Sequence, residues 1–232
     1  MQITNALLTP GASHGRTGQA LAPKGIVVHY VANPGSSAAA NRNWFENGAG
    51  GAYSSAHYII GLSGEILQLI PDDECAMHAG RAYGAAWTEQ AATNNARYIG
   101  IECCHPDSTG KFNDKTMAAL LWLLQTLCAK HGLHAARDIH RHYDVTGKNC
   151  PAYYVANADA WQALLRGVRS DLVNIVVNGK AETAFARLAG GRYQITFGEL
   201  WRLIDKEVPL RGVCEAAGFV VGYRDGTVTI SG

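Results

Sequence analysis

Short apolar runs and segments of helical spacing alternate along the first two thirds of the chain. Residues 25–31 form a β-branched apolar run that ends at His29 and Tyr30 and predicts a buried strand. Residues 54–61 and 65–70 predict two short strands joined by Leu62-Ser63-Gly64, which is a hairpin pattern. Further strands are expected over the ranges 98–104 and 137–143.

The clearest helix is predicted over residues 114–130, because one set of apolar side chains recurs at helical spacing and Gly132 follows as a C-cap. This set consists of Met117, Leu120, Leu121, Leu124, Leu127 and Cys128. Residues 36–47 predict a helix that starts at Ser36 or Ser37, and residues 157–168 predict another. Alternating strands and helices indicate an α/β fold, a central sheet with helices packed on its faces.

The pattern changes around residues 167–171, which divides the chain into residues 1–168 and a small module at 172–232. Within the module, strand-like runs bound a predicted pair of helices, so an α+β fold is expected. Asn178-Gly179 and Asp225-Gly226 are strong tight-turn dipeptides. A module of this size is near the lower limit for independent folding.

Composition excludes several classes of function. The 232 residues are 47% hydrophobic and 17% charged, as in a folded globular protein. The net charge of +1 and the lack of a basic block argue against nucleic-acid binding. Apolar stretches are too short for membrane insertion, and the N-terminus shows no secretory signal. The six cysteines lack C-x-x-C spacing, so most are expected to be small buried hydrophobes in a reducing compartment.

Two histidines and a cysteine form the candidate chemistry. His29 ends a strand of core residues, and His142 precedes Cys150 by eight positions across a glycine-containing turn. His140 and His142 share one face of the expected strand, so either could bind metal; the reach to Cys150 favours His142. Three such ligands leave the fourth position of a catalytic zinc site to water, which predicts metal-assisted hydrolysis.

Glu102 and Lys148 are the other candidates. Glu102 interrupts an apolar strand, where burying a carboxylate is costly unless it has a partner or a role. Beside a metal it could take a proton from bound water, although a solvent-facing position on the strand is equally compatible with the alternation. Lys148 could donate to the oxyanion formed at an attacked carbonyl, or be an ordinary solvated loop lysine.

Five segments in order resemble the type-2 zinc-dependent N-acetylmuramoyl-L-alanine amidases, a family that includes peptidoglycan recognition proteins and many phage endolysins. They are IVVHY at 26–30, SSAHYII at 54–60, MHAG at 77–80, NNARYIGIEC at 94–103 and HRHYDVTGKNCP at 140–151. The resemblance spans about residues 22–168. It implies the type-2 amidase fold, which has a mixed central sheet flanked by helices.

The resemblance also implies roles. His29, His142 and Cys150 map onto the zinc ligands, Glu102 onto the catalytic base and Lys148 onto the lysine that stabilises the transition state. Some members carry a catalytic tyrosine where this chain has Ala56, so that role has no counterpart here. Other members use aspartate as the third ligand; cysteine at that position favours an enzyme, because recognition proteins without amidase activity generally lack it.

His57 and His78 match positions that line the family's substrate cleft and are expected substrate contacts. Three aromatic residues could flank the same groove or simply pack at its rim: Trp44, Tyr83 and Trp87. The glycines at 48–51 lack the Gly-Lys-Ser/Thr ending of a phosphate-binding loop, which argues against nucleotide binding.

The expected function is hydrolysis of the amide between N-acetylmuramic acid and L-alanine in bacterial peptidoglycan. Two alternatives stay open: a non-catalytic peptidoglycan-binding protein on the same fold, and a cysteine hydrolase that uses Cys150 without metal. The lack of a signal peptide together with a wall-degrading activity suggests a phage or prophage endolysin, held in the host cytoplasm until release.

Residues 172–232 resemble the small stalk-like domains related to the N-terminal domain of copper amine oxidase, on turn placement and apolar pattern. The sequence of the module shows no metal-ligand cluster, so neither catalysis nor copper binding is expected there. Attachment to the cell wall is the functional expectation. Homodimerisation or a purely structural role is the alternative.

Overall fold

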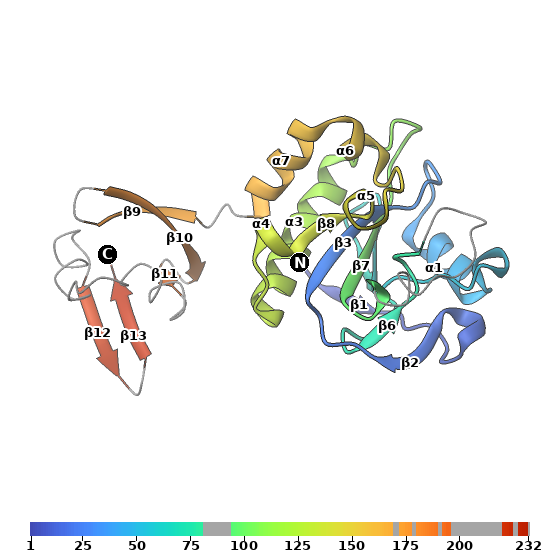
Figure 1. The fold of residues 1–232 in the computed structure, drawn as a ribbon, viewed down its shortest axis with the longest axis horizontal. Coiled ribbons are helices and arrows are strands. Elements are labelled where there is room, and N and C mark those ends of the chain that lie inside the picture. The colour runs from blue at the N-terminus through green and yellow to red at the C-terminus, as the bar shows by residue number, and fades with distance from the viewer. Residues whose placement is uncertain are drawn as a thin grey trace. The chain divides into compact units, whose positions relative to one another are not determined.

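The computed structural model describes residues 1–80 and 94–168 in full, and beyond them the backbone of five strands. The chain divides into two compact units, Met1–Val168 and Arg169–Gly232. The larger unit is built on a six-stranded sheet (Figure 1). In sheet order its strands are β1 (Ile3–Asn5), β5 (Ile66–Gln68), β4 (Tyr58–Ile60), β7 (Tyr98–Cys103), β3 (Gly25–Tyr30) and β8 (Ile139–Arg141).

The sheet is mixed, because β4 and β5 pair antiparallel while every other neighbouring pair is parallel. This confirms the expected α/β fold with a mixed central sheet. The antiparallel pair is the hairpin predicted around Leu62-Ser63-Gly64. A two-stranded sheet lies beside it, formed by β2 (Arg16–Ala20) and β6 (Glu74–Ala76).

The longer helices begin and end where local chemistry predicts. In α1 (Ala38–Glu46), the Ser37 side chain accepts a hydrogen bond from the backbone N–H of Ala40. In α3 (Asp114–His131), Asn113 caps the N-terminus in the same way, and Gly132 ends the helix in the left-handed conformation. The remaining helices are α4 (Ala135–Asp138), α5 (His142–Thr146), α6 (Ala152–Ala156) and α7 (Ala158–Val168), with single 3-10 turns at Ala12–His14 and Ala49–Gly51.

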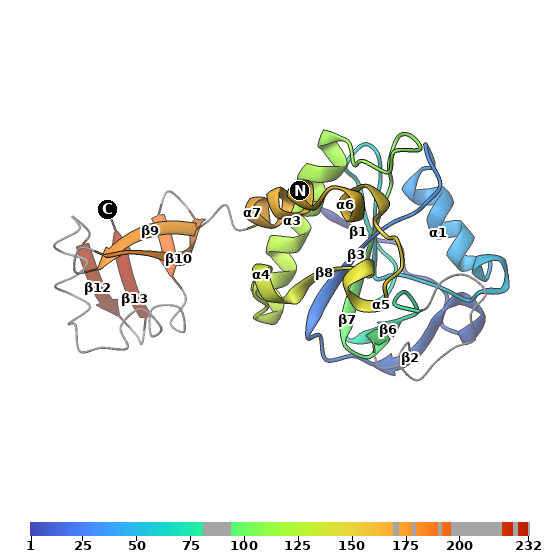
Figure 2. The ribbon, with the colours of Figure 1, turned by 45° about the horizontal axis from the view of Figure 1, so that its top comes forward.

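The sheet separates two hydrophobic clusters. Figures 1 and 2 show α3 and α7 on one side of the sheet and α1 on the other. The larger cluster joins α3 and α7 to alternate residues of the central strands, including Ile26, Ile99 and Ile101. Half of the predicted apolar face of α3 is buried (Leu120, Leu124 and Leu127), and the other half is partly buried (Met117, Leu121 and Cys128). Ala119 and Leu123 extend the buried face. Four described cysteines are free and buried, as expected: Cys75, Cys103, Cys104 and Cys150.

The strand predicted over residues 137–143 is wrong at both ends. It is only three residues long, Ile139–Arg141, and His142 is the first residue of α5. The chain turns into a helix here because the Asp144 carboxylate accepts hydrogen bonds from the backbone and the guanidinium of Arg141. His140 and His142 therefore do not share a strand face.

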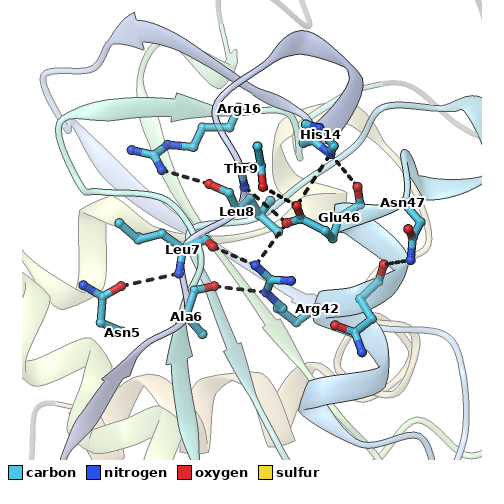
Figure 3. Close-up of polar contacts among 11 residues, drawn as sticks. Asn5, Ala6, Leu7, Leu8, Thr9, His14, Arg16, Arg42, Glu46 and Asn47 are labelled. Atoms are coloured by element: carbon cyan, nitrogen blue, oxygen red, sulfur yellow. Dashed lines mark hydrogen bonds and ion pairs between the residues drawn. The ribbon is translucent and has the colours of Figure 1, made fainter.

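The N-terminal segment is tied to α1 by a polar cluster that sequence patterns did not indicate (Figure 3). Arg42 donates to the carbonyls of Ala6 and Leu7 at 3.2 and 2.7 Å and pairs with Glu46 at 3.0 Å. Glu46 in turn accepts hydrogen bonds from the backbone and the hydroxyl of Thr9. These bonds satisfy the half-buried carbonyls of the two residues that directly follow β1, the strand that pairs with β5 at the edge of the sheet.

Replacing Arg42 with alanine is expected to lower the free energy of unfolding by about 1–3 kcal/mol, because two carbonyls lose a charged donor. Urea titration followed by circular dichroism measures the change. The exposed Arg97 offers a matched control, since its replacement by alanine should change stability little. Equal unfolding midpoints for the two variants would contradict this role of Arg42.

In the second unit, the described residues form two antiparallel groups. The strands β9 (Leu172–Val177), β10 (Lys180–Ala189) and β11 (Arg192–Ile195) make one, and β12 (Val220–Arg224) and β13 (Thr227–Ser231) the other. Val177 pairs with Lys180 and Arg224 with Thr227, so the strands reverse where the dipeptides predict turns. The first predicted helix is wrong at its start, because Arg192–Ile195 form the strand β11 and pair with β10. The rest of the predicted helix pair falls outside the described residues. No described helix is long and apolar enough to cross a membrane.

Candidate functional site

The structure brings His29, His142 and Cys150 together, although 121 residues separate the first from the last. Their nearest ligand atoms all lie within 4.8 Å of one another. Each residue is no more than 3% exposed. The three come from different elements: His29 from the carboxyl end of β3, His142 from the first position of α5, and Cys150 from the segment before α6.

Glu102 lies directly beside His29 because β3 and β7 pair in parallel with these two residues in register. Side chains paired in this way point to the same face of a sheet. This face is opposite the one that packs on α3 and α7, since Val28 and Ile101 belong to that cluster. The sheet thus presents an imidazole and a carboxylate side by side at its carboxyl edge.

The His142 ring shows which of its atoms could bind a metal. Its Nε2 lies 3.0 Å from the carbonyl oxygen of Gly80, which can only accept, so Nε2 carries the proton. Nδ1 then carries a lone pair, and this atom is buried without a hydrogen-bond partner. Such an atom is costly in a protein interior unless something binds it. His29 Nδ1 lies 3.8 Å from Cys150 Sγ in the same space.

Burial keeps these imidazoles neutral, which is the form that coordinates metal. Desolvation, with the charge of Lys148 as a second cause, lowers the pKa of His142 to about 4. Desolvation and the neighbouring His142 lower the pKa of His29 well below its ordinary value. Desolvation likewise raises the pKa of the Cys150 thiol to about 12, although the backbone N–H of Tyr30 donates to the sulfur.

Glu102 has the environment of a proton carrier. One carboxylate oxygen, Oε2, is shielded from solvent and has no hydrogen-bond partner. Desolvation raises the pKa of Glu102 to about 8, against the opposing charge of Lys148. Lys148 itself is exposed. The carboxyl group can therefore gain and lose a proton near neutral pH, as general acid–base catalysis requires.

His57 and His78 are buried behind His29, with both ring nitrogens of each engaged. His57 Nδ1 accepts from the backbone of Gly100 at 2.9 Å, and Nε2 contacts the carbonyl of Glu74 at 2.9 Å. His78 lies between His29 and the carbonyl of Tyr98. These positions favour a role in holding the site over the substrate contact that the sequence suggested.

The other candidates are less informative. Trp44 is 46% exposed on α1, so it lies at the surface, whereas Tyr83 and Trp87 lie outside the described residues. Ala56 is fully buried. Sequence analysis did not assign a role to Gly80 or Gly100. The carbonyl of Gly80 accepts the hydrogen bond of His142, and the missing side chain of Gly100 leaves room for the ring of His78. A glycine inside an apolar strand often marks a close approach of another group, and Gly100 carried that signal.

The fold and the site define a class: an α/β protein with a His-His-Cys group that could bind a metal at the carboxyl edge of its sheet. The family model of N-acetylmuramoyl-L-alanine amidase matches residues 19–153, a range that contains His29, Glu102, His142, Lys148 and Cys150. The chain therefore belongs to the type-2 N-acetylmuramoyl-L-alanine amidase family.

Known proteins of this kind are similar over the first unit. A probable N-acetylmuramoyl-L-alanine amidase from Bacillus licheniformis is 39% identical over 155 residues, which are 64% of this chain and 42% of that protein. The solved catalytic domain of XlyA, an amidase of Bacillus subtilis, has a TM-score of 0.58 at 31% identity, covering 72% of this chain and 99% of that one. A structure described as a mutant endolysin from Bacillus subtilis has a TM-score of 0.58 at 32% identity, covering 72% and 98%.

The chain spans about two fifths of the length of the first curated relatives it matches. The two solved structures, in contrast, are matched almost entirely. The similarity thus concerns the unit that carries the His-His-Cys group.

Proposed function

We propose that the protein is a zinc-dependent amidase that cleaves the bond between N-acetylmuramic acid and L-alanine in bacterial peptidoglycan. The observation that carries the proposal is the buried, unpartnered Nδ1 of His142, which faces a space shared with His29 and Cys150. Membership of the amidase family and similarity to the catalytic domain of XlyA support the reaction and the substrate.

The donor set fits zinc. Two neutral imidazoles and one thiolate are ligands that zinc accepts in tetrahedral sites, and three protein ligands leave a fourth position open. When bound, zinc would polarise the substrate carbonyl and lower the pKa of a water molecule at that position. His29, His142 and Cys150 would hold it, and the hydrogen bond from His142 to Gly80 would fix the ring that binds it.

Glu102 and Lys148 supply the remaining chemistry in this proposal. Glu102 takes a proton from the attacking water as the water oxygen bonds to the carbonyl carbon. The C–N bond then breaks, and Glu102 returns the proton to the nitrogen of the departing L-alanine. The Lys148 ammonium stabilises the negative charge that develops on the carbonyl oxygen. The partly apolar setting of Glu102 suits it to both proton transfers.

The cysteine hydrolase alternative needs an activated thiol at Cys150. From the sequence, Cys150 precedes Pro151 in a loop and is predicted to lack the helix N-terminus that often activates a catalytic thiol; this prediction is wrong, because α6 begins two residues later at Ala152. The pKa argues against the alternative, however: the thiol is buried and desolvation raises its pKa to about 12, whereas a catalytic cysteine needs a depressed pKa. The geometry favours Cys150 as a ligand.

Product analysis on purified cell walls tests the function. New N-terminal alanine is the expected product, and new reducing sugar ends would refute an amidase. Removal of zinc by a chelator should abolish lysis, and added zinc should restore it. Lysis that survives chelation would reject the zinc mechanism, and zinc binding without any lysis would favour a non-catalytic peptidoglycan-binding protein.

For its biological setting, we propose a phage or prophage endolysin that stays in the host cytoplasm until the membrane is breached. The similarity to a structure described as an endolysin supports this setting. When the protein is expressed inside host cells, the cells are expected to lyse only after the cytoplasmic membrane is permeabilised. Lysis in the absence of any membrane-permeabilising protein would contradict it.

For the second unit, we propose attachment to the cell wall. A chain that ends at Val168 is expected to turn over small soluble muropeptides at nearly the full rate. It should lyse intact walls about tenfold more slowly or worse, because tethering raises the effective concentration of enzyme at its substrate. The test measures the rates of the full and the truncated chain side by side, on soluble muropeptides and on intact walls.

Co-sedimentation with purified walls separates anchoring from the alternatives. The full chain should sediment and the shortened chain should stay in solution. Equal lysis of intact walls by both, together with a full chain that runs as a dimer in light scattering, would replace anchoring by a homodimerisation role.

A further inference from the structure

His78 makes a chain of hydrogen bonds from one ligand to the backbone. Its Nε2 lies 2.9 Å from the carbonyl oxygen of Tyr98, and its Nδ1 lies 3.0 Å from Nε2 of His29. The carbonyl can only accept, so the proton of His78 sits on Nε2. His78 is buried, a setting that favours the neutral imidazole with a single N–H, so Nδ1 offers a lone pair.

The same logic fixes the tautomer of His29. Because His78 Nδ1 accepts, Nε2 of His29 must donate the hydrogen bond that joins them. The lone pair of His29 is then on Nδ1, the atom that lies 3.8 Å from Cys150 Sγ. Without His78, either nitrogen of His29 could carry the proton, and one of the two forms would direct an N–H at the ligand group.

Two neighbouring residues fix the position of His78: Asn95 bonds to its backbone, and Gly100 leaves space for its ring. The Asn95 side chain accepts hydrogen bonds from the backbone N–H groups of His78 and Ala79 at 3.0 and 2.8 Å. On the facing strand, a β-carbon at Gly100 would lie 2.5 Å from Cγ of His78 and 2.7 Å from its Nδ1. A side chain at position 100 would therefore displace the ring.

We propose that His78 is a positioning residue that holds His29 with its Nδ1 lone pair toward His142 and Cys150, and that Gly100 supplies the space it needs. The proposal rests on the proposed function in that this lone pair is one of the three zinc donors. Outer partners of metal-binding histidines orient the ring in this way, and their loss costs metal affinity.

Two variants of equal shape test the hydrogen bond. His78→Asn keeps an acceptor oxygen at the position of Nδ1, whereas His78→Leu matches asparagine in shape and offers no acceptor. Zinc affinity, measured by competition with a chromophoric chelator, is expected to fall about 10–100-fold in His78→Leu and to stay much closer to the parent protein in His78→Asn. Gly100→Ala should lose affinity as His78→Leu does.

Nitrogen NMR of the metal-free protein gives a second readout that needs neither zinc nor activity. His29 should show a protonated Nε2 in the parent protein and in His78→Asn, and a mixture of tautomers in His78→Leu. His14→Ala is the control, since it removes another imidazole that contacts a backbone carbonyl, that of Glu46, and should change neither measurement.

Unchanged zinc affinity and an unchanged His29 tautomer in His78→Leu would overturn the proposal. Equal losses of zinc affinity in His78→Asn and His78→Leu would also overturn it, because the affinity would then depend on the packing of the His78 ring rather than on its hydrogen-bond acceptor. If the parent protein bound no zinc, the proposed function would fail, and the His29 tautomer in the metal-free variants would still decide the role of His78.

Discussion

Replacing Glu102 with glutamine is expected to slow wall lysis by about 10²–10⁴-fold while leaving the zinc content unchanged. Glutamine keeps the size of the side chain and removes its ability to take a proton. Glu102 pairs with His29 on the adjacent strand but is not one of the three candidate ligands that converge, so metal binding should survive. Lysis rate and elemental analysis of the purified variant provide the two measurements.

Glu65→Gln serves as the control, since its carboxylate bonds to Ser63 in the hairpin and takes no part in the site. That variant should lyse walls at the parent rate. Normal lysis by Glu102→Gln would show that another group, or water alone, carries the proton. A loss of zinc in Glu102→Gln would show that the carboxylate helps to hold the ligands.

Cys150→Ala is expected to weaken zinc binding by more than about 100-fold and to reduce lysis to the level of the chelated protein, because the substitution removes a proposed direct ligand rather than the partner of one. Two buried histidines would remain, with Nδ1 of His142 still unpartnered. Chelator competition measures affinity and wall turbidity measures lysis.

Cys104→Ala is the matched control for this variant. Cys104 is also free and fully buried, but it packs in the cluster on the α1 side of the sheet. Its replacement should cost some stability and leave zinc affinity unchanged. Tight zinc binding by Cys150→Ala would remove the cysteine from the ligand set, and full lysis without it would reject the proposed mechanism.

The periodic elements of the first unit could be predicted because burial dominates them. The run that ends at His29 and the helix capped by Asn113 and Gly132 follow directly from apolar spacing and capping chemistry. The first strands could not be predicted in this way. β1 and β2 are mostly exposed and polar. β1 is held by its pairing with β5 and β2 by bonds such as those from Arg16 to Glu74, rather than by an apolar pattern.

The site divides along the same line. Residue types and motif order indicated His29, Glu102, His142, Lys148 and Cys150, and their roles stay predictions until the variants are measured. The surroundings were not indicated, because they are backbone groups and empty space. The carbonyl of Gly80 has no signature in residue chemistry, and Gly100 indicated a close approach without showing that the ring of His78 makes it. The turn of His142 into α5 depended on the local bonds of Asp144.

His78 and Gly80 belong to one short turn, and through them that turn contacts the rings of both candidate histidine ligands. Anyone transplanting this centre into a designed scaffold would need this turn and the facing strand in addition to the three segments that carry the candidate ligands. A graft of the ligands alone would leave both imidazoles free to rotate and to choose either tautomer. Including the turn, together with a glycine on the facing strand, would give the designer a preorganised centre.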